Sequence, residues 1–64
     1  MILISKKSNW KNKNIDLLFK NEKNEFFNYS MNPISAREKD LKEGRNYDLL
    51  FSKFDKNKLI AILD

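Results

Sequence analysis

Two short segments of this 64-residue chain combine several lysines with one aromatic residue. Residues 6–13 read KKSNWKNK, and residues 53–58 read KFDKNK. Ammonium groups bind phosphates and flat rings stack on nucleobases, so this combination is typical of proteins that bind single-stranded nucleic acid. The residues of these segments that we expect to contact nucleic acid are Lys6, Lys7, Trp10, Lys11, Lys13, Phe54, Lys56 and Lys58.

The positive charge of the chain is concentrated near its N-terminus. Thirteen Lys and Arg against nine Asp and Glu give a formal net charge of +4. Residues 1–14 hold four lysines and no acid, whereas residues 15–64 hold nine bases and nine acids. A local positive field favours polyanions such as nucleic acid, an anionic membrane surface or an acidic protein. The alternative interpretation is a solvated, lysine-rich loop that only aids solubility.

The composition argues against catalysis. The chain has no cysteine and no histidine, which excludes disulfides, soft-ligand zinc sites and the Cys-His and Ser-His-Asp mechanisms. A single glycine excludes a Walker loop and a dinucleotide-binding turn. The carboxylates Asp40, Glu43, Asp48 and Asp55 lack the spacing of a calcium loop or a two-metal cluster. We therefore expect no enzyme activity, no cofactor and no metal.

The apolar runs of the chain are short. Residues 1–4 and 59–63 fall far below the ~20 residues that cross a bilayer. The chain shows neither a basic region ahead of its first apolar residues nor a small-residue cleavage site. The lysine-rich segment holds Asn and Ser where an interfacial helix would place bulky apolar residues. We therefore expect a cytoplasmic protein without a membrane partner.

Apolar residues alternate with polar ones along much of the chain, which predicts strands. Residues 5–14 are polar and are expected to form a loop, and residues 21–24 and 55–58 are typical of turns. The expected strands are residues 2–4, 15–20, 25–31, 47–54 and 59–63.

The segment between the third and fourth strands changes its pattern and predicts a helix. Ser35 and Glu38 have the spacing of a capping box, and residues 36–43 are mostly good helix formers. Gly44 stands where a left-handed C-terminal cap belongs. We expect about two helical turns, anchored by Leu41, that cover an opening in a sheet.

Three strands, a short helix and two strands form one small, mainly β domain over residues 1–64. This order resembles that of the oligonucleotide/oligosaccharide-binding barrels, and the resemblance covers most of the chain without any specific motif. It implies a five-stranded antiparallel barrel that binds its ligand over the second and third strands, between the first–second and fourth–fifth loops. An SH3-like barrel and an open sheet with one covering helix are the alternatives.

The strand pattern assigns one face to the core and leaves apolar residues on the other. The expected core is Ile2, Ile4, Ile15, Leu17, Phe19, Phe27, Tyr29, Met31, Leu41, Tyr47, Leu49 and Phe51. The opposite face would hold Leu18, Phe26, Leu50 and Phe54, a cluster that marks an interface. Phe26 on the third strand is expected to join the stacking rings.

The leading hypothesis is a small basic protein that binds single-stranded DNA or RNA with low sequence specificity. The alternative is a protein-interaction module, such as an inhibitor or accessory subunit encoded by a mobile element, that acts through its exposed apolar face. Its charged loops would then bind an acidic protein partner. A homodimer formed by that face is compatible with both.

Overall fold

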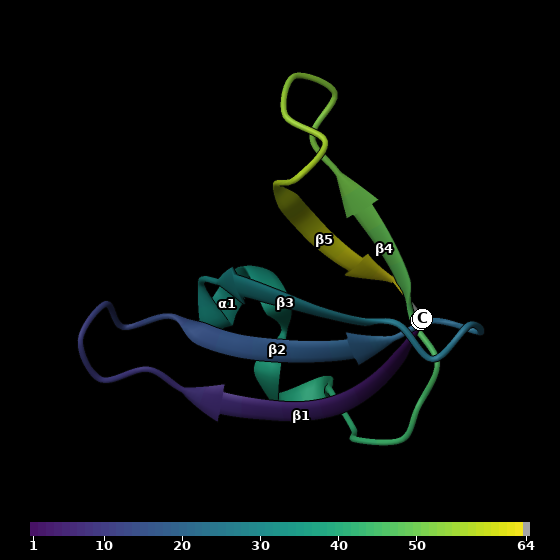
Figure 1. Cartoon of the computed structure of the whole chain (residues 1–64). Coiled ribbons are helices and arrows are strands. Elements are labelled where there is room, and N and C mark those ends of the chain that lie inside the picture. The colour runs from purple at the N-terminus through teal and green to yellow at the C-terminus, as the bar shows by residue number, and fades with distance from the viewer. Residues whose placement is uncertain (64) are drawn as a thin grey trace.

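A computed structural model describes residues 1–63 of the chain (Figure 1). It confirms a mainly β chain with a short helix between the third and fourth strands. In chain order, the elements are β1 (Ile2–Ser8), β2 (Ile15–Lys20), β3 (Phe26–Met31), α1 (Pro33–Ala36), the 3₁₀ turn η1 (Glu38–Asp40), β4 (Asp48–Phe51) and β5 (Leu59–Leu63). Neither helical segment in this part of the chain is long and apolar enough to span a membrane.

The strands form two antiparallel sheets, with β1, β2 and β3 in one and β4 and β5 in the other. An isolated bridge between Ile2 and Asn46 joins the sheets at one side, where the Tyr47 amide donates to the Met1 carbonyl at 2.7 Å. Across residues 1–63, no ladder pairs β3 with β5, so the predicted closed barrel is not confirmed. Figure 1 shows that the β4–β5 hairpin diverges from the larger sheet and that its loop lies farthest from that sheet.

The first strand is longer than the sequence predicted. Residues 5–8 were expected to lie in a loop, but they pair with residues 15–18 of β2. A register shift between Leu3 and Ser5 interrupts the alternation of β1. Leu3 is consequently fully buried while Ile2 and Ile4 are only half-buried, so the prediction that Ile2 and Ile4 fill the core from β1 was wrong.

The core lies between the two sheets, and the alternation of β2 is confirmed. Within the described chain, the buried apolar residues are Leu3, Ile15, Leu17, Phe19, Met31, Ala36, Leu41, Tyr47, Leu59 and Ile62. The half-buried Tyr29 ring joins the sheets, because its centroid lies 6.2 Å from that of Phe19 in β2 and 5.5 Å from that of Phe51 in β4. Each large side chain buried here contributes about 1.5–3 kcal/mol before conformational entropy is counted.

The helix is shorter and begins earlier than the capping-box pattern predicted. Asn32 is its N-cap, and the side-chain oxygen of Asn32 accepts from the Ile34 amide at 2.8 Å. Proline is favoured at the first helical position because its missing N–H has no partner to lose there. The helix ends at Arg37, whose φ of 53° is left-handed. The predictions that Ser35 caps the helix and that it extends over residues 36–43 were therefore wrong.

The segment after η1 is held against β1 by backbone and side-chain hydrogen bonds. Gly44 has a φ of 87°, and its amide donates to the Leu3 carbonyl at 2.7 Å. The left-handed glycine thus lies in a loop that pairs with β1 and does not end a helix. The buried Tyr47 hydroxyl accepts from the Lys42 amide at 2.8 Å, which fixes the loop from its other side.

Candidate nucleic-acid interface

The β1–β2 loop, residues 9–14, holds its tryptophan away from the protein. The Lys11 amide donates to the Asn9 side-chain oxygen, and the Asn14 amide donates to that of Asn12, both at 3.0 Å. A backbone hydrogen bond from Asn9 to Asn14, 2.7 Å long, closes the loop. These turns leave Trp10 95% exposed, with Lys11 exposed beside it. The ring is thus presented to solvent by a defined turn.

The β4–β5 loop, residues 52–58, presents its aromatic residue in the same way. The Ser52 hydroxyl accepts from the amides of Phe54 and Asp55 at 3.2 and 3.3 Å. The Asp55 carboxylate accepts from the Asn57 amide at 3.0 Å. Phe54 is fully exposed at the tip. The exposed lysines of this loop are Lys53, Lys56 and Lys58.

Lys6 does not occupy the position that the sequence predicted for a phosphate-binding loop lysine. It lies within β1 and is half-buried. Its ammonium group donates to the carbonyls of Glu38 and Leu41 at 2.9 and 2.7 Å, so its charge is used to hold η1 against the sheet. Lys7 is exposed but also lies within β1, where its register partner is Asp16 of β2.

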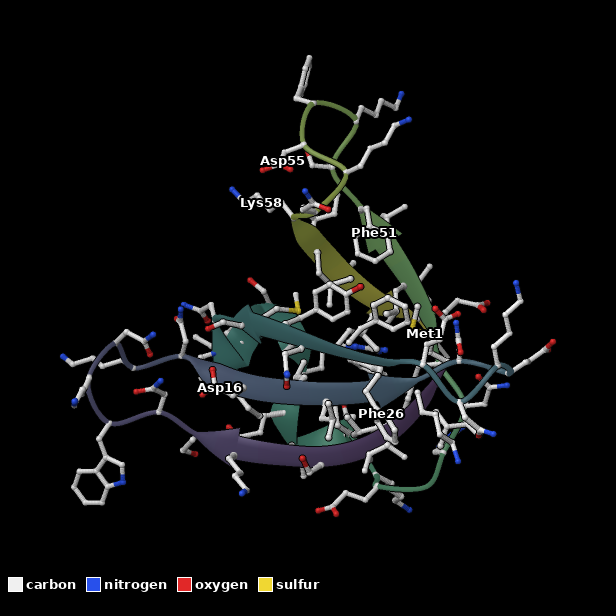
Figure 2. The ribbon with its side chains drawn as sticks, viewed as in Figure 1. Met1, Asp16, Phe26, Phe51, Asp55 and Lys58 are labelled. Carbon is white, nitrogen blue, oxygen red and sulfur yellow. The ribbon has the colours of Figure 1, made fainter. Side chains whose placement is uncertain are left out.

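Phe26 lies apart from both loops. It begins β3, is 60% exposed and has Lys20 of β2 as its register partner. Figure 2 shows Phe26 on the larger sheet, well away from Asp55 and Lys58 on the β4–β5 loop. The expected platform that combines Phe26 with the loop rings is therefore not assembled in this structure.

The exposed apolar residues also divide between the two sheets. Leu18 is half-buried in β2, whereas Leu50 in β4 is 47% exposed. Leu50 shares the small hairpin with Ile60 and Leu63 of β5, which are 45% and 48% exposed. The exposed apolar surface of the hairpin is thus made by residues that sequence alternation had not grouped together.

A groove of about 530 Å³ lies between β3 and the beginning of β5 and reaches both loops. Asn14 lines it from the β1–β2 loop, and Lys58 lines it from the β4–β5 loop. The tips of these loops lie at different corners of the molecule in Figure 1, so the structure does not bring the two predicted loops together. Four carboxamide side chains belong to its lining, namely those of Asn14, Asn28, Asn32 and Asn57. Sequence reasoning missed them, although the high asparagine content was a signal.

The groove itself carries little net charge. Its ionisable residues are Asp55, Lys58 and Tyr29. A phenol is neutral at physiological pH, and burial raises the pKa of the Tyr29 phenol further above its usual 10.0. The arrangement is therefore a polar, nearly neutral groove between two basic loops.

Comparison with protein-family models, with curated protein sequences and with solved structures found no match for this chain. Within residues 1–63, acidic residues nowhere gather in a group of three or more that could hold a metal ion.

Proposed function

We propose that this chain binds single-stranded nucleic acid with low sequence specificity through its β1–β2 and β4–β5 loops. The observation that carries the proposal is that each loop holds one almost fully exposed ring among exposed lysines. Backbone amides that donate to the side-chain oxygens of Asn9, Asn12 and Ser52 order these loops before any ligand binds. A pre-organised loop backbone loses less conformational entropy on binding, which favours affinity.

We also infer that the two sheets are halves of an open barrel of the oligonucleotide-binding type. The Ile2–Asn46 bridge supports one seam of such a barrel, and the approach of β5 to β3 supports the other. In those barrels the ligand lies between the first–second and fourth–fifth loops. The groove of this chain has that position, with Asn14 at one end and Lys58 at the other.

In this proposal one nucleic-acid strand contacts both loops. Phosphates contact Lys11 and Lys13 at one end and Lys56 and Lys58 at the other, while Trp10 and Phe54 stack on bases. The molecule measures 32 × 28 × 19 Å, so one strand can reach both loops only if it is several nucleotides long. Sites of about 4–16 nucleotides are normal for a fold of this type.

The direct test is the binding of labelled oligothymidylate and oligouridylate, about 16 nucleotides long, by fluorescence anisotropy. Binding should be saturable, should quench Trp10 emission, and should weaken between about 50 mM and about 200 mM salt, because lysine–phosphate contacts release counterions. Absence of binding at the lower salt concentration, or equal affinity at both, would refute the proposal.

The stacking contribution is tested with Trp10→Ala and Phe54→Ala. A stacked base is worth about 1–3 kcal/mol, so each variant should bind about 5- to 150-fold more weakly. Ile34→Ala is the matched control, because Ile34 is 87% exposed but lies on α1, outside both loops. If the control loses as much affinity as the loop variants, the rings are not stacking residues.

Protein interaction is the second candidate function. The observation that favours it is the exposed apolar surface of Leu50, Ile60 and Leu63 on the β4–β5 hairpin. If this surface forms a homodimer, light scattering should show a mass that rises with concentration, and Leu50→Glu should abolish that rise. A monomeric mass at every concentration tested would contradict the homodimer.

A further inference from the structure

The free edge of β3 presents backbone hydrogen-bonding groups to the groove. In the β2–β3 hairpin the Asn21 amide donates to the Glu25 carbonyl at 3.1 Å, so these residues form a hydrogen-bonded pair. Such pairs alternate along an antiparallel ladder with pairs whose N–H and C=O groups point away from the partner strand. Counting from this pair through the register of β3, Asn28 and Ser30 direct their N–H and C=O groups to the free edge.

The beginning of β5 presents the same kind of edge. The Ser52 amide donates to the Lys58 carbonyl at 2.9 Å, so Leu59, one position further, directs its backbone groups away from β4. Further along β5, the Ile62 carbonyl also points outward, and the Arg37 guanidinium donates to it at 3.0 Å. Arg37 therefore covers the later part of this edge, whereas Leu59 faces the groove.

Both edges open onto one space. Asn28, Ser30 and Leu59 all line the groove of about 530 Å³, and within residues 1–63 no strand lies between β3 and β5. Unpaired strand edges are templates for another extended chain, which gains a hydrogen bond for each donor and acceptor it matches. An extended chain in this groove would pair with the free edge of β3 and reach the backbone groups of Leu59 at the beginning of β5.

We propose that the groove binds an extended, acidic peptide segment by β-strand addition. A peptide backbone supplies both N–H donors and C=O acceptors, as the two edges require, whereas a phosphodiester backbone supplies acceptors but no N–H donors. Alternate side chains of the added strand would face the half-buried Tyr29 and the buried Met31, which suits apolar residues.

The charge of the two loops indicates that the outward-facing side chains of this peptide are acidic. Residues 9–14 carry two lysines and no acid, and residues 52–58 carry three lysines and one aspartate. Acidic side chains on the outer face of the added strand would lie between these basic loops. This inference is independent of nucleic-acid binding. It is based on the backbone groups of the strand edges, whereas the nucleic-acid proposal is based on the aromatic rings of the loops.

The test uses the full chain labelled with ¹⁵N and an acetylated heptapeptide in which Glu alternates with Val and Thr. Amide exchange of Asn28, Ser30 and Leu59 should slow at least about tenfold when the peptide is bound, because their N–H groups enter new ladders. A peptide with Lys in place of Glu, and one with N-methylated backbone amides, should protect none of them. Absence of protection by the Glu peptide, or equal protection by either control peptide, overturns the proposal.

A matched pair of variants tests the β3 edge itself. Ser30→Pro removes an outward N–H without removing a hydrogen bond to β2, and proline is tolerated at such edge positions. Ser30→Pro should bind the Glu peptide at least about tenfold more weakly, and Ser30→Ala, which keeps the N–H, should bind it as the unaltered chain does. Equal binding by both variants contradicts strand addition at β3. If circular dichroism shows that Ser30→Pro is unfolded, the N-methylated peptide decides the question.

Nucleic acid is the competing occupant of the groove, and the same amides distinguish the two. Oligothymidylate bound only by the loops should leave the exchange of Asn28, Ser30 and Leu59 unchanged. If it protects these amides as strongly as the Glu peptide does, the groove is a nucleic-acid site and the peptide proposal is wrong. If oligothymidylate does not bind but the Glu peptide still protects these amides, the nucleic-acid proposal is wrong and the peptide proposal is supported.

Discussion

The ammonium group of Lys6 lies 2.7 Å from the carbonyl oxygen of Leu41 and donates a hydrogen bond to it. A second hydrogen bond from the same group reaches the Glu38 carbonyl at 2.9 Å. The Glu38 carbonyl also accepts from the Leu41 amide at 3.2 Å within η1, and a cation near the end of a helical turn is favourable. One of the N-terminal lysines therefore contributes to the fold by holding η1 against β1.

We predict that Lys6→Met destabilises the protein by about 1–2 kcal/mol, because the variant leaves both carbonyls without their charged donor. Urea unfolding measures this change. Lys7→Met is the matched control on the same strand, and because Lys7 is exposed its effect should stay within about 0.5 kcal/mol. Equal stability of the two variants would show that the Lys6 hydrogen bonds contribute nothing to folding.

A second prediction concerns Tyr47, whose buried hydroxyl accepts from the Lys42 amide at 2.8 Å. Tyr47→Phe keeps the ring but leaves that amide without this acceptor, which should cost about 1–2 kcal/mol. Thermal or urea unfolding checks the value. The loop before β4 should also exchange its amide hydrogens faster in the variant. An unchanged exchange rate at Lys42 would contradict the role that we assign to the hydroxyl.

We predict that substitution of Lys13 by glycine raises the stability of the chain but weakens its binding of oligonucleotides. Its φ of 58° is left-handed, a conformation that costs a non-glycine residue about 1–2 kcal/mol. Lys13→Gly removes that cost but adds about 0.5–1 kcal/mol of backbone entropy, so stability should rise by about 0.5–1 kcal/mol. Oligonucleotide affinity should fall in the same variant because a phosphate contact is lost. A variant that is more stable and binds equally well would exclude Lys13 from the interface.

The raised pKa of Tyr29 predicts how stability depends on alkaline pH. Burial disfavours the phenolate in the folded state, so the unfolded chain ionises first as the pH passes 10.0. The stabilisation from the neutral phenol is fully present below that pH and is lost as pH rises through the folded-state pKa. The free energy of unfolding should therefore fall more steeply above pH 10.0 in the unaltered chain than in Tyr29→Phe. Parallel curves for the two proteins would argue against a desolvated phenol.

Local patterns along the chain predicted much of the fold. Alternation located β2 and the inward face of β3 correctly, because each strand buries one face and the period of two is unambiguous there. The extension of β1 through Lys6 and Lys7 was missed, since polar residues pair with β2 there and only tertiary structure reveals the partner. The helix was misplaced because Asn32 and Ser35 are both good caps, and only Asn32 precedes a proline.

The candidate site was predictable only in part. The lysine-rich sequences around Trp10 and Phe54 indicated exposed rings, and both rings are exposed. The groove between the loops could not be predicted, because it depends on how far β5 stands from β3 in space. Nor could the sequence show that Lys6 is held by backbone carbonyls of a segment more than thirty residues away, at Glu38 and Leu41.

The most direct test of the central claim is the salt dependence of oligothymidylate binding in charge-removal variants. For single strands the slope of log affinity against log salt is about −0.7 per phosphate contact, so Lys11→Gln/Lys13→Gln and Lys56→Gln/Lys58→Gln should each reduce it by about 1.4. Lys23→Gln/Lys39→Gln, which removes two exposed lysines outside both loops, should leave it unchanged. An equal reduction in all three variants, or none in the loop variants, would contradict a nucleic-acid interface formed by the two loops.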